Sequence, residues 1–527
     1  MRIKKVIVVL LTLCIASGWL TACGGGKTES SNSTSNQDNQ QVVANNDEKS
    51  ETDSQSETAD EPETEEDPFP GADLGGVTIR VAGLQNPETA DEAKKEMWRE
   101  RQKYVEEKFN CKLEFDALEG IEWNDVPNAI ITSLAAGDPI VDIGEMSRYY
   151  IRDLVTNDAI LDLTEEVKAF NFPKSYYEGG CQWGDKIIGF SKQPMFPWSA
   201  LVYNRDLIKS VGMEKTPGEM FKEGKWSLGD FYEYCVELKS KLPEGVSVLG
   251  IHALNWARGA SYANGAYMLD PNTYVPSYTS EAFYEVIEFF QKLVAEGIAV
   301  NATPVTRDDG TTGYDWNTAQ EGFAEGKLAI AHGDEWNFES YAASFDYGIV
   351  PFPWGSSVTI QNNDYTTLSD NYSNYYKDCG VFVIVKGAEK KATPEQYMNL
   401  VFSYLQDEGE FLLENREKEA KGEPITPQNA GQPRNFTSDL DIELWDWYVS
   451  RVKFDPTDTT AQSNVFFRAL YEVCATNKDP RSAFESVIGE DTYSLVEAGL
   501  IDENDIPADI KAKMEEYIAT HPDETQE

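Results

Sequence analysis

The sequence predicts an open α/β fold, because segments with the periodicity of β-strands alternate along the chain with segments of helical periodicity. Residues 77–81 alternate between apolar and polar side chains, as a strand does, and Gly83 ends the pattern. Apolar residues then recur at helical spacing over residues 91–109, and the alternation resumes at residues 113–115. A strand, a helix and a second strand in this order predict a parallel pair with a right-handed crossover.

A further helix and strand follow directly. The helical pattern of residues 125–136 stops at the Gly-Asp-Pro sequence of residues 137–139, and residues 140–143 have the pattern of the next strand. In an open α/β sheet the ligand site lies beyond the carboxyl ends of the strands. We therefore expect binding residues just after residues 140–143 and after later strands of the same kind.

A series of short motifs then occurs in a fixed order along the chain. The motifs lie at residues 133–143, 150–154, 160–163, 189–190, 201–207, 225–231, 323–330, 347–353, 380–384 and 392–396. In sequence and order, over most of residues 76–519, they resemble the extracellular solute-binding proteins of bacterial ABC importers, family 1, sugar type. Residues 415–455 are rich in Gly, Pro and Trp and depart from the family pattern.

That resemblance implies a two-lobe α/β fold of the type II periplasmic-binding-protein kind, with the lobes joined by a multi-strand hinge. The crossing strands are expected near residues 198–203 and 370–380. Each lobe would be built from two separate segments. The implied boundaries are residues 71–200 plus about 378–425 for lobe 1, residues 201–377 plus about 426–519 for lobe 2, and residues 520–527 for a tail.

Residues 1–22 have the pattern of a secretory signal peptide. Basic residues near the start precede an apolar run over residues 6–15, which is shorter than the roughly 20 apolar residues that span a bilayer. The segment closes with Leu-Thr-Ala-Cys at residues 20–23, which resembles a bacterial lipobox. The resemblance implies cleavage before Cys23 and attachment of lipid, palmitate included, at that cysteine. An ordinary signal peptide with an incidental cysteine is the alternative.

Residues 23–70 are expected to form a disordered tether that begins at the lipidated Cys23. Ser, Asn, Gln, Thr, Asp and Glu dominate this segment, which has almost no large apolar residue, so burial cannot offset the entropy lost on ordering. Its second half is acidic, for example at residues 61–67, and repulsion between like charges extends such a segment.

The net charge of the chain excludes some classes of partner. It is −46, from 45 basic and 91 acidic side chains. So negative a protein does not bind nucleic acid phosphates, and it offers no polybasic surface to anionic lipid. The charge itself names no ligand, because a solvated acidic surface is its ordinary meaning.

The cysteines do not predict a framework of disulfide bridges. Of the seven, Cys14 and Cys23 belong to the leader, and the others lack CxxC spacing and regular intervals. We expect mostly buried thiols, and the sequence leaves open one disulfide bridge whose position it does not give. The remaining cysteines are Cys111, Cys181, Cys235, Cys379 and Cys474.

No catalytic signature accompanies this pattern. The chain lacks a Gly-x-Ser-x-Gly elbow, a Walker-type loop, a Gly-x-Gly-x-x-Gly turn and a His-Glu-x-x-His pair, and it has only 3 His. Adjacent carboxylates at residues 308–309 and 334–335 are nominees for a glycosidase, but 91 acidic side chains make such pairs expected from composition. We expect no catalysis, no cofactor and no metal.

Binding chemistry is better supported. A sugar presents apolar C–H faces and a rim of hydroxyls, so its site needs flat aromatic rings together with charged hydrogen-bonding groups. Aromatic and charged residues near the expected strand ends and hinge supply both. Each of these residues has an ordinary alternative role, which is packing for the aromatic residues and a helix-face salt bridge for Glu145 and Arg148. Trp226 is not a candidate, because it is assigned to packing. The candidate ligand-binding residues are Glu145, Arg148, Trp198, Trp256, Arg258, Asp334, Trp336, Tyr372, Tyr375 and Tyr376.

Taken together, these features predict a lipid-anchored solute-binding protein on the extracytoplasmic face of the bacterial cell membrane. It would be a monomer that captures a mono- or oligosaccharide by closing a cleft, and it would deliver this solute to the membrane permease of an ABC transporter. Two alternatives remain at this point. One is a secreted glycoside hydrolase, and the other is a surface adhesin or sensor module.

Overall fold

The chain divides into two units, residues 1–70 and 71–527. Cys23 and the residues predicted to form the signal peptide and most of the tether lie outside the described residues, as do Trp336 and Cys379. The structure, a computed structural model, describes residues 67–115, 117–122, 125–300, 305–306, 312–313, 316–334, 337–377, 380–423, 425, 436–459 and 465–522.

The first sheet has four strands in the order β14-β3-β1-β2. Strand β1 pairs in parallel with β2 and with β3, as the strand-helix-strand pattern predicts, whereas β14 is antiparallel to β3. The strands are β1 (Val77–Ala82), β2 (Cys111–Glu114), β3 (Ile143–Met146) and β14 (Val381–Ile384). The sheet therefore joins strands near the start of the described residues to a strand that comes more than two hundred residues after β3.

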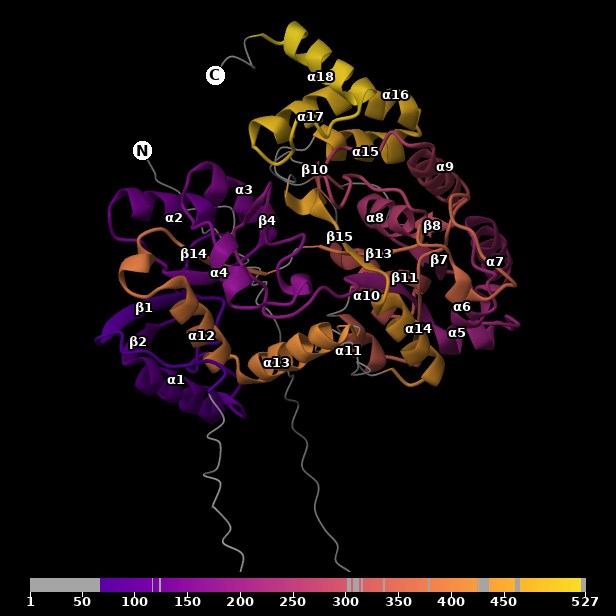
Figure 1. The fold of residues 1–527 in the computed structure, drawn as a ribbon. Coiled ribbons are helices and arrows are strands. Elements are labelled where there is room, and N and C mark those ends of the chain that lie inside the picture. The colour runs from indigo at the N-terminus through magenta and orange to yellow at the C-terminus, as the bar shows by residue number, and fades with distance from the viewer. Residues whose placement is uncertain are drawn as a thin grey trace, which may run out of the picture. The chain divides into compact units, whose positions relative to one another are not determined.

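Helices from both ends of the sequence cover this sheet. Helices α1 (Lys95–Phe109) and α12 (Pro394–Tyr404) lie side by side, although they are far apart in the chain (Figure 1). Helices α2 (Val126–Ala135) and α3 (Arg148–Thr156) pack against each other. Within α1, Val105 and Phe109 are fully buried, because the four-residue spacing places them on one face of the helix.

Strand β3 begins three residues later than the sequence predicts. The apolar pattern at residues 140–143 favours a strand there, but the regular pairing starts only at Ile143. Asp142 explains the difference, because its carboxylate accepts the backbone N–H of Arg80 at 2.7 Å. A side chain thus takes a hydrogen bond that a strand carbonyl would otherwise accept, so the ladder is interrupted at that point.

The second sheet has five strands in the order β12-β6-β11-β7-β8. Strand β11 is parallel to β7 and antiparallel to β6, and β6 is in turn antiparallel to β12. The strands are β6 (Ser199–Asn204), β7 (Ser247–Gly250), β8 (Ala299–Val300), β11 (Leu328–Asp334) and β12 (Tyr347–Val350). All seven residues of β11 are buried, which is the pattern of a strand covered on both faces.

Local sequence explains where the helices around this sheet begin. Thr216 with Glu219 and Ser227 with Asp230 form capping boxes, in which side chain and backbone exchange hydrogen bonds at the helix start. Trp226, between these two helices, is fully buried and donates its indole N–H to the carbonyl of Pro351 at 3.1 Å, as its assignment to packing predicts. The helices are α6 (Pro217–Lys222), α7 (Leu228–Lys241), α8 (Ala253–Ala263), α9 (Glu281–Ala295) and α10 (Trp316–Ala324).

The chain passes between the two sheets along two segments that touch each other. The outward segment ends in β6, and the return segment contains β13 (Asn374–Tyr376) and leads to β14. The backbone N–H of Trp198 donates to the carbonyl of Tyr375 at 3.0 Å. Strand β13 also pairs in parallel with β15 (Val452–Phe454). The crossing therefore occurs within the segments 198–203 and 370–380 that the sequence predicts, with a third strand beside the second.

The C-terminal helices contact parts of the molecule associated with both sheets. Trp183 donates its indole N–H to the carbonyl of Ala498 at 3.2 Å, and Tyr278 donates its hydroxyl to Asp491 at 3.1 Å. Trp183 belongs to a hairpin near the first sheet, whereas Tyr278 leads into α9 of the second. These helices are α15 (Val465–Thr476), α16 (Pro480–Glu485), α17 (Ile488–Glu497) and α18 (Ala508–Thr520).

The remaining elements are short or peripheral. They are α4 (Thr164–Ala169), α5 (Arg205–Ser210), α11 (Phe338–Ala342), α13 (Gln406–Lys421), α14 (Asp439–Val449), β4 (Gln182–Trp183), β5 (Lys186–Ile187), β9 (Val305–Thr306) and β10 (Thr312–Gly313). Within the described ranges, none of the helices has both the length and the apolar character needed to cross a membrane.

The cysteines of the described residues are buried thiols, as predicted. They are Cys111, Cys181, Cys235 and Cys474. Burial raises the pKa of the Cys111 thiol to about 11, so it stays protonated at neutral pH. These side chains therefore act as small apolar residues of the core.

Candidate functional site

Two carboxylates lie at strand ends where the crossing segments enter the two sheets. Asp334 is the last residue of β11 and is in register with Ser199, the first residue of β6. Glu145 lies near the end of β3 and is in register with Phe382 of β14, which directly follows the return segment. Each sheet thus has a carboxylate at or near a strand end next to a crossing segment, and the sequence predicts the ligand site beyond the carboxyl ends of the strands.

Glu145 is paired with a lysine that no sequence pattern singled out. The Lys192 ammonium lies 2.8 Å from Oε2 of Glu145, and the Glu145 side chain retains 18% of its exposure. Burial disfavours the charge of Lys192, but attraction to Glu145 outweighs this and raises the pKa of Lys192. A Cβ atom at Gly380 would clash with the Glu145 carboxylate, so the glycine leaves room for the side chain.

Asp334 is more deeply buried and has fewer partners. The residue is 8% exposed, and the amide of Gln320 donates to Oδ2 at 3.4 Å. Within the described part of the chain, Oδ1 accepts no hydrogen bond. Burial raises the pKa of Asp334 to about 7, and the positive charges of Lys377 and Arg258 oppose that rise.

A histidine lies against the unsatisfied oxygen of Asp334. His332, two residues earlier on β11, places Nε2 3.6 Å from Oδ1. Its other ring nitrogen, Nδ1, lies 3.1 Å from the amide nitrogen of Asn255. Because an amide N–H donates, Nδ1 is assigned as the acceptor, and Nε2 then carries the proton and faces Asp334. Burial lowers the pKa of His332 well below its usual value, so the ring is neutral.

Three aromatic rings gather on the crossing segments. The ring centroids of Phe196 and Tyr376 are 4.9 Å apart, and those of Trp198 and Tyr376 are 6.0 Å apart. Trp198 keeps part of its surface exposed, and the Lys377 ammonium lies 5.4 Å from its ring centroid. We refer to Phe196, Trp198 and Tyr376 as the aromatic cluster. Such a cluster supplies the flat apolar surface that the C–H face of a sugar ring stacks on.

A hydroxyl pair ties the two crossing segments together beside Asp334. Ser199 Oγ and Tyr375 Oη are 2.7 Å apart, and both residues are almost fully buried. Ser199 is also in register with Asp334 on the neighbouring strand, so the carboxylate, the serine and the tyrosine belong to adjacent backbone positions.

Three further candidate residues lie in packed interior. Trp256, on α8, is fully buried and donates its indole N–H to the carbonyl of Val286 at 3.1 Å. Tyr372 is 1% exposed and donates its hydroxyl to the carbonyl of Phe352 at 2.9 Å. Arg258 is 1% exposed and pairs with Asp455 at 3.1 Å, so of the three only its charge reaches the site, through its effect on Asp334.

Arg148 also has protein partners. Its guanidinium is buried, donates to the carbonyl of Gln182 at 2.8 Å and lies over the rings of Trp183 and Phe454. Trp336 lies outside the described residues. The structure therefore brings together Trp198, Asp334, Tyr375 and Tyr376, and Glu145 lies at the other end of the return segment. The remaining described candidates are buried in the packing around these residues.

Sequence reasoning missed several residues of this region. Lys192, Lys377 and His332 carry no local signal, because their position depends on pairing between segments that are distant in the chain. Phe196 and Ser199 flank Trp198, and only their place next to the expected hinge could have pointed to them.

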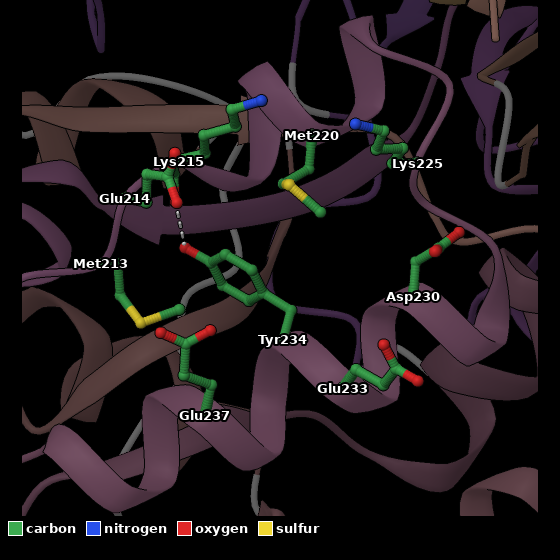
Figure 2. A pocket seen from close by; sticks show the side chains of 9 residues that line it. All are labelled: Met213, Glu214, Lys215, Met220, Lys225, Asp230, Glu233, Tyr234 and Glu237. Atoms are coloured by element: carbon green, nitrogen blue, oxygen red, sulfur yellow. Dashed lines mark hydrogen bonds between the residues drawn. The ribbon is translucent and has the colours of Figure 1, made fainter.

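A surface cavity elsewhere does not compete with this site. It has a volume of about 410 Å³ and lies along α6 and α7, with Met213 and Met220 among its lining residues (Figure 2). Lys215, at its edge, pairs with Glu223, and Tyr234 donates its hydroxyl to the carbonyl of Lys215 at 2.9 Å. None of its lining residues comes from the crossing segments. Among the described residues there is also no group of three or more His, Cys, Asp or Glu side chains able to hold a metal ion.

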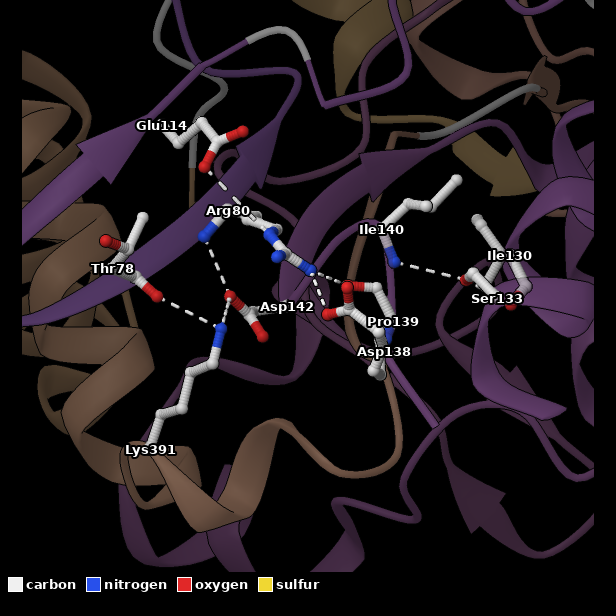
Figure 3. A network of polar contacts seen from close by, with 10 residues as sticks. All are labelled: Thr78, Arg80, Glu114, Ile130, Ser133, Asp138, Pro139, Ile140, Asp142 and Lys391. Atoms are coloured by element: carbon white, nitrogen blue, oxygen red, sulfur yellow. Dashed lines mark hydrogen bonds and ion pairs between the residues drawn. The ribbon is translucent and has the colours of Figure 1, made fainter. Parts of the chain in front are cut away.

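A network around Asp142 is structural. The Lys391 ammonium lies 2.8 Å from Asp142 Oδ2 and 3.0 Å from the carbonyl of Thr78, and Arg80 reaches Asp138 at 2.7 Å (Figure 3). Asp142 is 1% exposed. The network joins β1 to the loop before β3 and to the chain that returns after β14, on the side of the first sheet that α12 covers.

Residues 86–377, more than half of the chain, match the family of bacterial extracellular solute-binding proteins. The chain belongs to this family. The resemblance carried by the short motifs is thereby confirmed, and so is the two-lobe α/β fold that it implies. No curated protein matches the sequence of this solute-binding protein.

Solved structures share the two-lobe fold of this solute-binding protein at low sequence identity. The sugar-binding protein MalE from Xanthomonas citri is 13% identical, covers 80% of this chain and 98% of its own, and has a TM-score of 0.53. The ABC substrate-binding protein Lmo0181 from Listeria monocytogenes, in complex with cycloalternan, is 15% identical, covers 81% and 100%, and also scores 0.53. UgpB from Mycobacterium tuberculosis, in complex with glycerophosphocholine, is 15% identical, covers 80% and 99%, and scores 0.50.

Proposed function

We propose that this solute-binding protein captures a carbohydrate between its two lobes and delivers it to the permease of an ABC transporter. The observation that carries the proposal is the aromatic cluster of Phe196, Trp198 and Tyr376 on the crossing segments, in which Trp198 directly precedes Ser199, the residue in register with Asp334. Aromatic faces bind the C–H surface of a sugar, and carboxylates accept strong hydrogen bonds from its hydroxyls. Two structural relatives, the sugar-binding MalE and Lmo0181 with its cycloalternan, support the same ligand class.

The ligand contacts divide between the lobes. Glu145 is the contact from lobe 1, and Asp334 with the neighbouring Trp336 is the contact from lobe 2. Trp198 of the aromatic cluster stacks on the sugar at the crossing strands, and Tyr376, which is 4% exposed, packs against Trp198 and completes the ligand-binding surface. In this proposal Tyr375 and Arg258 support these groups from below, while Arg148, Trp256 and Tyr372 hold the surrounding frame. The proposal assigns residues 71–200 plus about 378–425 to lobe 1 and residues 201–377 plus about 426–519 to lobe 2.

Capture proceeds by closure. A solute that docks on one lobe and then bridges to the other stabilises the closed form, so the closed population rises with ligand concentration. The closed pair of lobes offers the permease one composite surface. We propose binding without turnover, by a monomer, so sugars incubated with the protein should be recovered intact by chromatography.

The location of the protein follows from its leader in this proposal. Cleavage before Cys23 and lipidation of that residue hold the protein at the extracytoplasmic face of the cell membrane. The acidic tether of residues 23–70 then lets the binding lobes move above the membrane and raises their effective concentration near the permease.

Calorimetry with a panel of sugars tests the proposed ligand class. Affinity of order micromolar corresponds to about −8 kcal/mol and would suffice for capture and release. A thermal-shift screen adds a second readout, because ligand at 100 times its dissociation constant stabilises a protein by about 2.7 kcal/mol. Glycerophosphocholine, amino acids and short peptides serve as the competing classes. Heat from one of these classes, with none from any sugar, would overturn the carbohydrate assignment and leave the binding role intact.

A further inference from the structure

Asp334 has an incomplete set of hydrogen bonds in a buried position. Its Oδ1 accepts no hydrogen bond from the described residues, and the Nε2–H of His332 lies 3.6 Å from it, beyond hydrogen-bond distance. Nε2 of His332 is itself without a partner in the same part of the structure. A buried carboxylate oxygen that lacks a donor is costly when ionised, so a donor added at Oδ1 would stabilise the ionised form.

Titratable and charged groups from several elements surround Asp334. His332 lies on the same strand, and Ser199 faces Asp334 across the sheet. The other titratable or charged groups within electrostatic reach of Asp334 or His332 are His252 and Arg258 at α8, Tyr375 and Lys377 on the return segment, and Tyr341 on α11, while Asp455 pairs with Arg258. Burial favours the protonated form of Asp334, and the cations Lys377 and Arg258 favour its ionised form.

We propose that Asp334 couples solute capture to proton release, because its ionised carboxylate accepts a charge-assisted hydrogen bond from a hydroxyl of the solute. This inference rests on the proposed function, since it needs a hydroxyl-bearing solute at the crossing strands. It adds a regulatory property to the same site: capture weakens in acid and strengthens above neutral pH.

The direction follows from the two states of the carboxyl. Without ligand, burial raises the pKa of Asp334 to about 7, so the group is mostly protonated at pH 6 and mostly ionised at pH 8. A solute hydroxyl that donates to Oδ1 favours the ionised form and lowers that pKa. Binding at pH 6 therefore expels a proton, and the work of expelling it reduces the affinity.

His332 does not produce the same dependence. Burial and the nearby charges lower its pKa well below its usual value, so the ring stays neutral through the range in which Asp334 titrates. Its role is to present Nε2–H to the carboxylate, with Asn255 fixing the tautomer through Nδ1. It is a positioning residue for Asp334.

Calorimetry on the full chain at several pH values tests the coupling. The probes are glucose, maltose, maltotriose and cellobiose, each titrated at pH 6 and at pH 8, with two buffers of unlike ionisation enthalpy that both buffer at the chosen pH. For a group with a pKa of about 7, affinity should be about tenfold weaker at pH 6 than at pH 8. The difference in heat between buffers of unlike ionisation enthalpy gives the protons released, which should approach about 0.9 per sugar at pH 6.

Two variants show whether Asp334 or another group causes the pH dependence of binding. Asp334→Asn keeps the shape of the side chain and removes its titration, so its affinity should be the same at pH 6 and pH 8, with no proton released. Glu325→Gln is the matched control at the opposite end of β11, where the carboxylate is exposed, and it should behave like the parent protein.

The outcomes are distinct. Sugar binding with equal pH dependence in the parent and in Asp334→Asn would overturn the proton coupling and leave carbohydrate capture standing. Heat from none of the sugars at either pH, while glycerophosphocholine binds, would overturn the proposed function and the coupling with it. A tenfold pH effect that Asp334→Asn abolishes and Glu325→Gln retains is the expected result.

Discussion

Ser199 and Tyr375, one on each crossing segment, lie within 2.7 Å of each other through their hydroxyl oxygens. Both are buried, and the backbone bond from Trp198 to Tyr375 lies directly beside them. The two passages between the sheets therefore form one joined element. Any movement of one lobe relative to the other has to preserve this contact or break it.

The first prediction concerns that contact. Tyr375→Phe removes one hydroxyl and leaves Ser199 Oγ buried without its partner, which should lower the free energy of unfolding by about 1–2 kcal/mol. Urea unfolding measures the change. Ser199→Ala and the double variant complete a mutant cycle, and a coupling energy near zero would show that the hydroxyls do not stabilise each other. Tyr232→Phe, which removes an exposed hydroxyl that donates to Glu296, is the control.

The second prediction concerns the aromatic cluster. Trp198→Ala removes a partly exposed ring at the crossing strands, so the dissociation constant for a bound sugar should rise about tenfold, while the fold is retained. Isothermal calorimetry measures it. Tyr104→Ala removes an aromatic ring that is 45% exposed on α1 and should leave affinity unchanged. Equal affinity in both variants would show that the sugar does not stack on Trp198.

The third prediction concerns the ion network of the first sheet. Lys391→Met leaves Asp142, which is 1% exposed, without its cation, and losing one partner of a buried pair typically costs about 3–5 kcal/mol. The ammonium is partly exposed and Asp142 keeps the N–H of Arg80, so we expect about 3 kcal/mol in denaturant unfolding.

Lys386→Met is the matched control for that network. It removes a lysine paired with the exposed carboxylate of Asp158, so the expected cost is below about 1 kcal/mol. If both lysine variants lost the same stability, the burial of Asp142 would be irrelevant to the network.

The fourth prediction is a pH dependence of stability. Burial among the C-terminal helices raises the pKa of Asp491 to about 7, partly offset by the hydroxyl of Tyr278. The unfolded chain has the ordinary value of 3.8. The folded protein therefore binds the extra proton between these values, and this contribution to stability is full below pH 3.8 and is lost as the pH rises to about 7.

Asp491→Asn removes that dependence. An amide oxygen still accepts the hydroxyl of Tyr278, and no charge is created at high pH. Relative to the parent, the variant should be more stable at pH 8 than at pH 4, by up to about 4 kcal/mol. Thermal unfolding at the two pH values gives the difference, and Glu497→Gln, exposed on the same helix, should show none. A constant offset between parent and Asp491→Asn would contradict the shift.

The fifth prediction concerns the leader. Radiolabelled palmitate should enter the parent protein and should be absent from Cys23→Ala, which should also leave the membrane fraction. Cys14→Ala, inside the segment that is removed, should retain both label and membrane association. A soluble mature protein that begins at another residue would undo the proposed anchor.

Periodicity was sufficient to predict the elements whose hydrogen bonds are regular. A strand, a helix and a strand occur over residues 77–115 in the predicted order, although the helix begins at Lys95 and not at residue 91. Strand β3 is displaced because Asp142 satisfies a neighbouring backbone N–H through its side chain. Composition and spacing carry no information on such a bond.

The candidate site was predictable only in part, for a similar reason. Trp198 was found because an aromatic residue next to an expected crossing strand favours a binding role. Trp256 carries the same kind of signal, but its helix is buried on all sides, so its indole lies in the core. The positions of Lys192 and Lys377 beside the candidate site depend on contacts between distant segments, which the sequence does not show. The sequence can show that a residue lies near the hinge, whereas the direction of its side chain depends on its tertiary neighbours.

The order of strands in the first sheet has a consequence for biosynthesis. Strands β1 to β3 come early in the chain, but their sheet lacks its antiparallel edge until β14 at residues 381–384 has been synthesised. The five strands of the second sheet all lie within residues 199–350, so the chain that forms that sheet is contiguous. Completing the first sheet therefore requires contacts over a longer sequence separation, and such contacts slow folding.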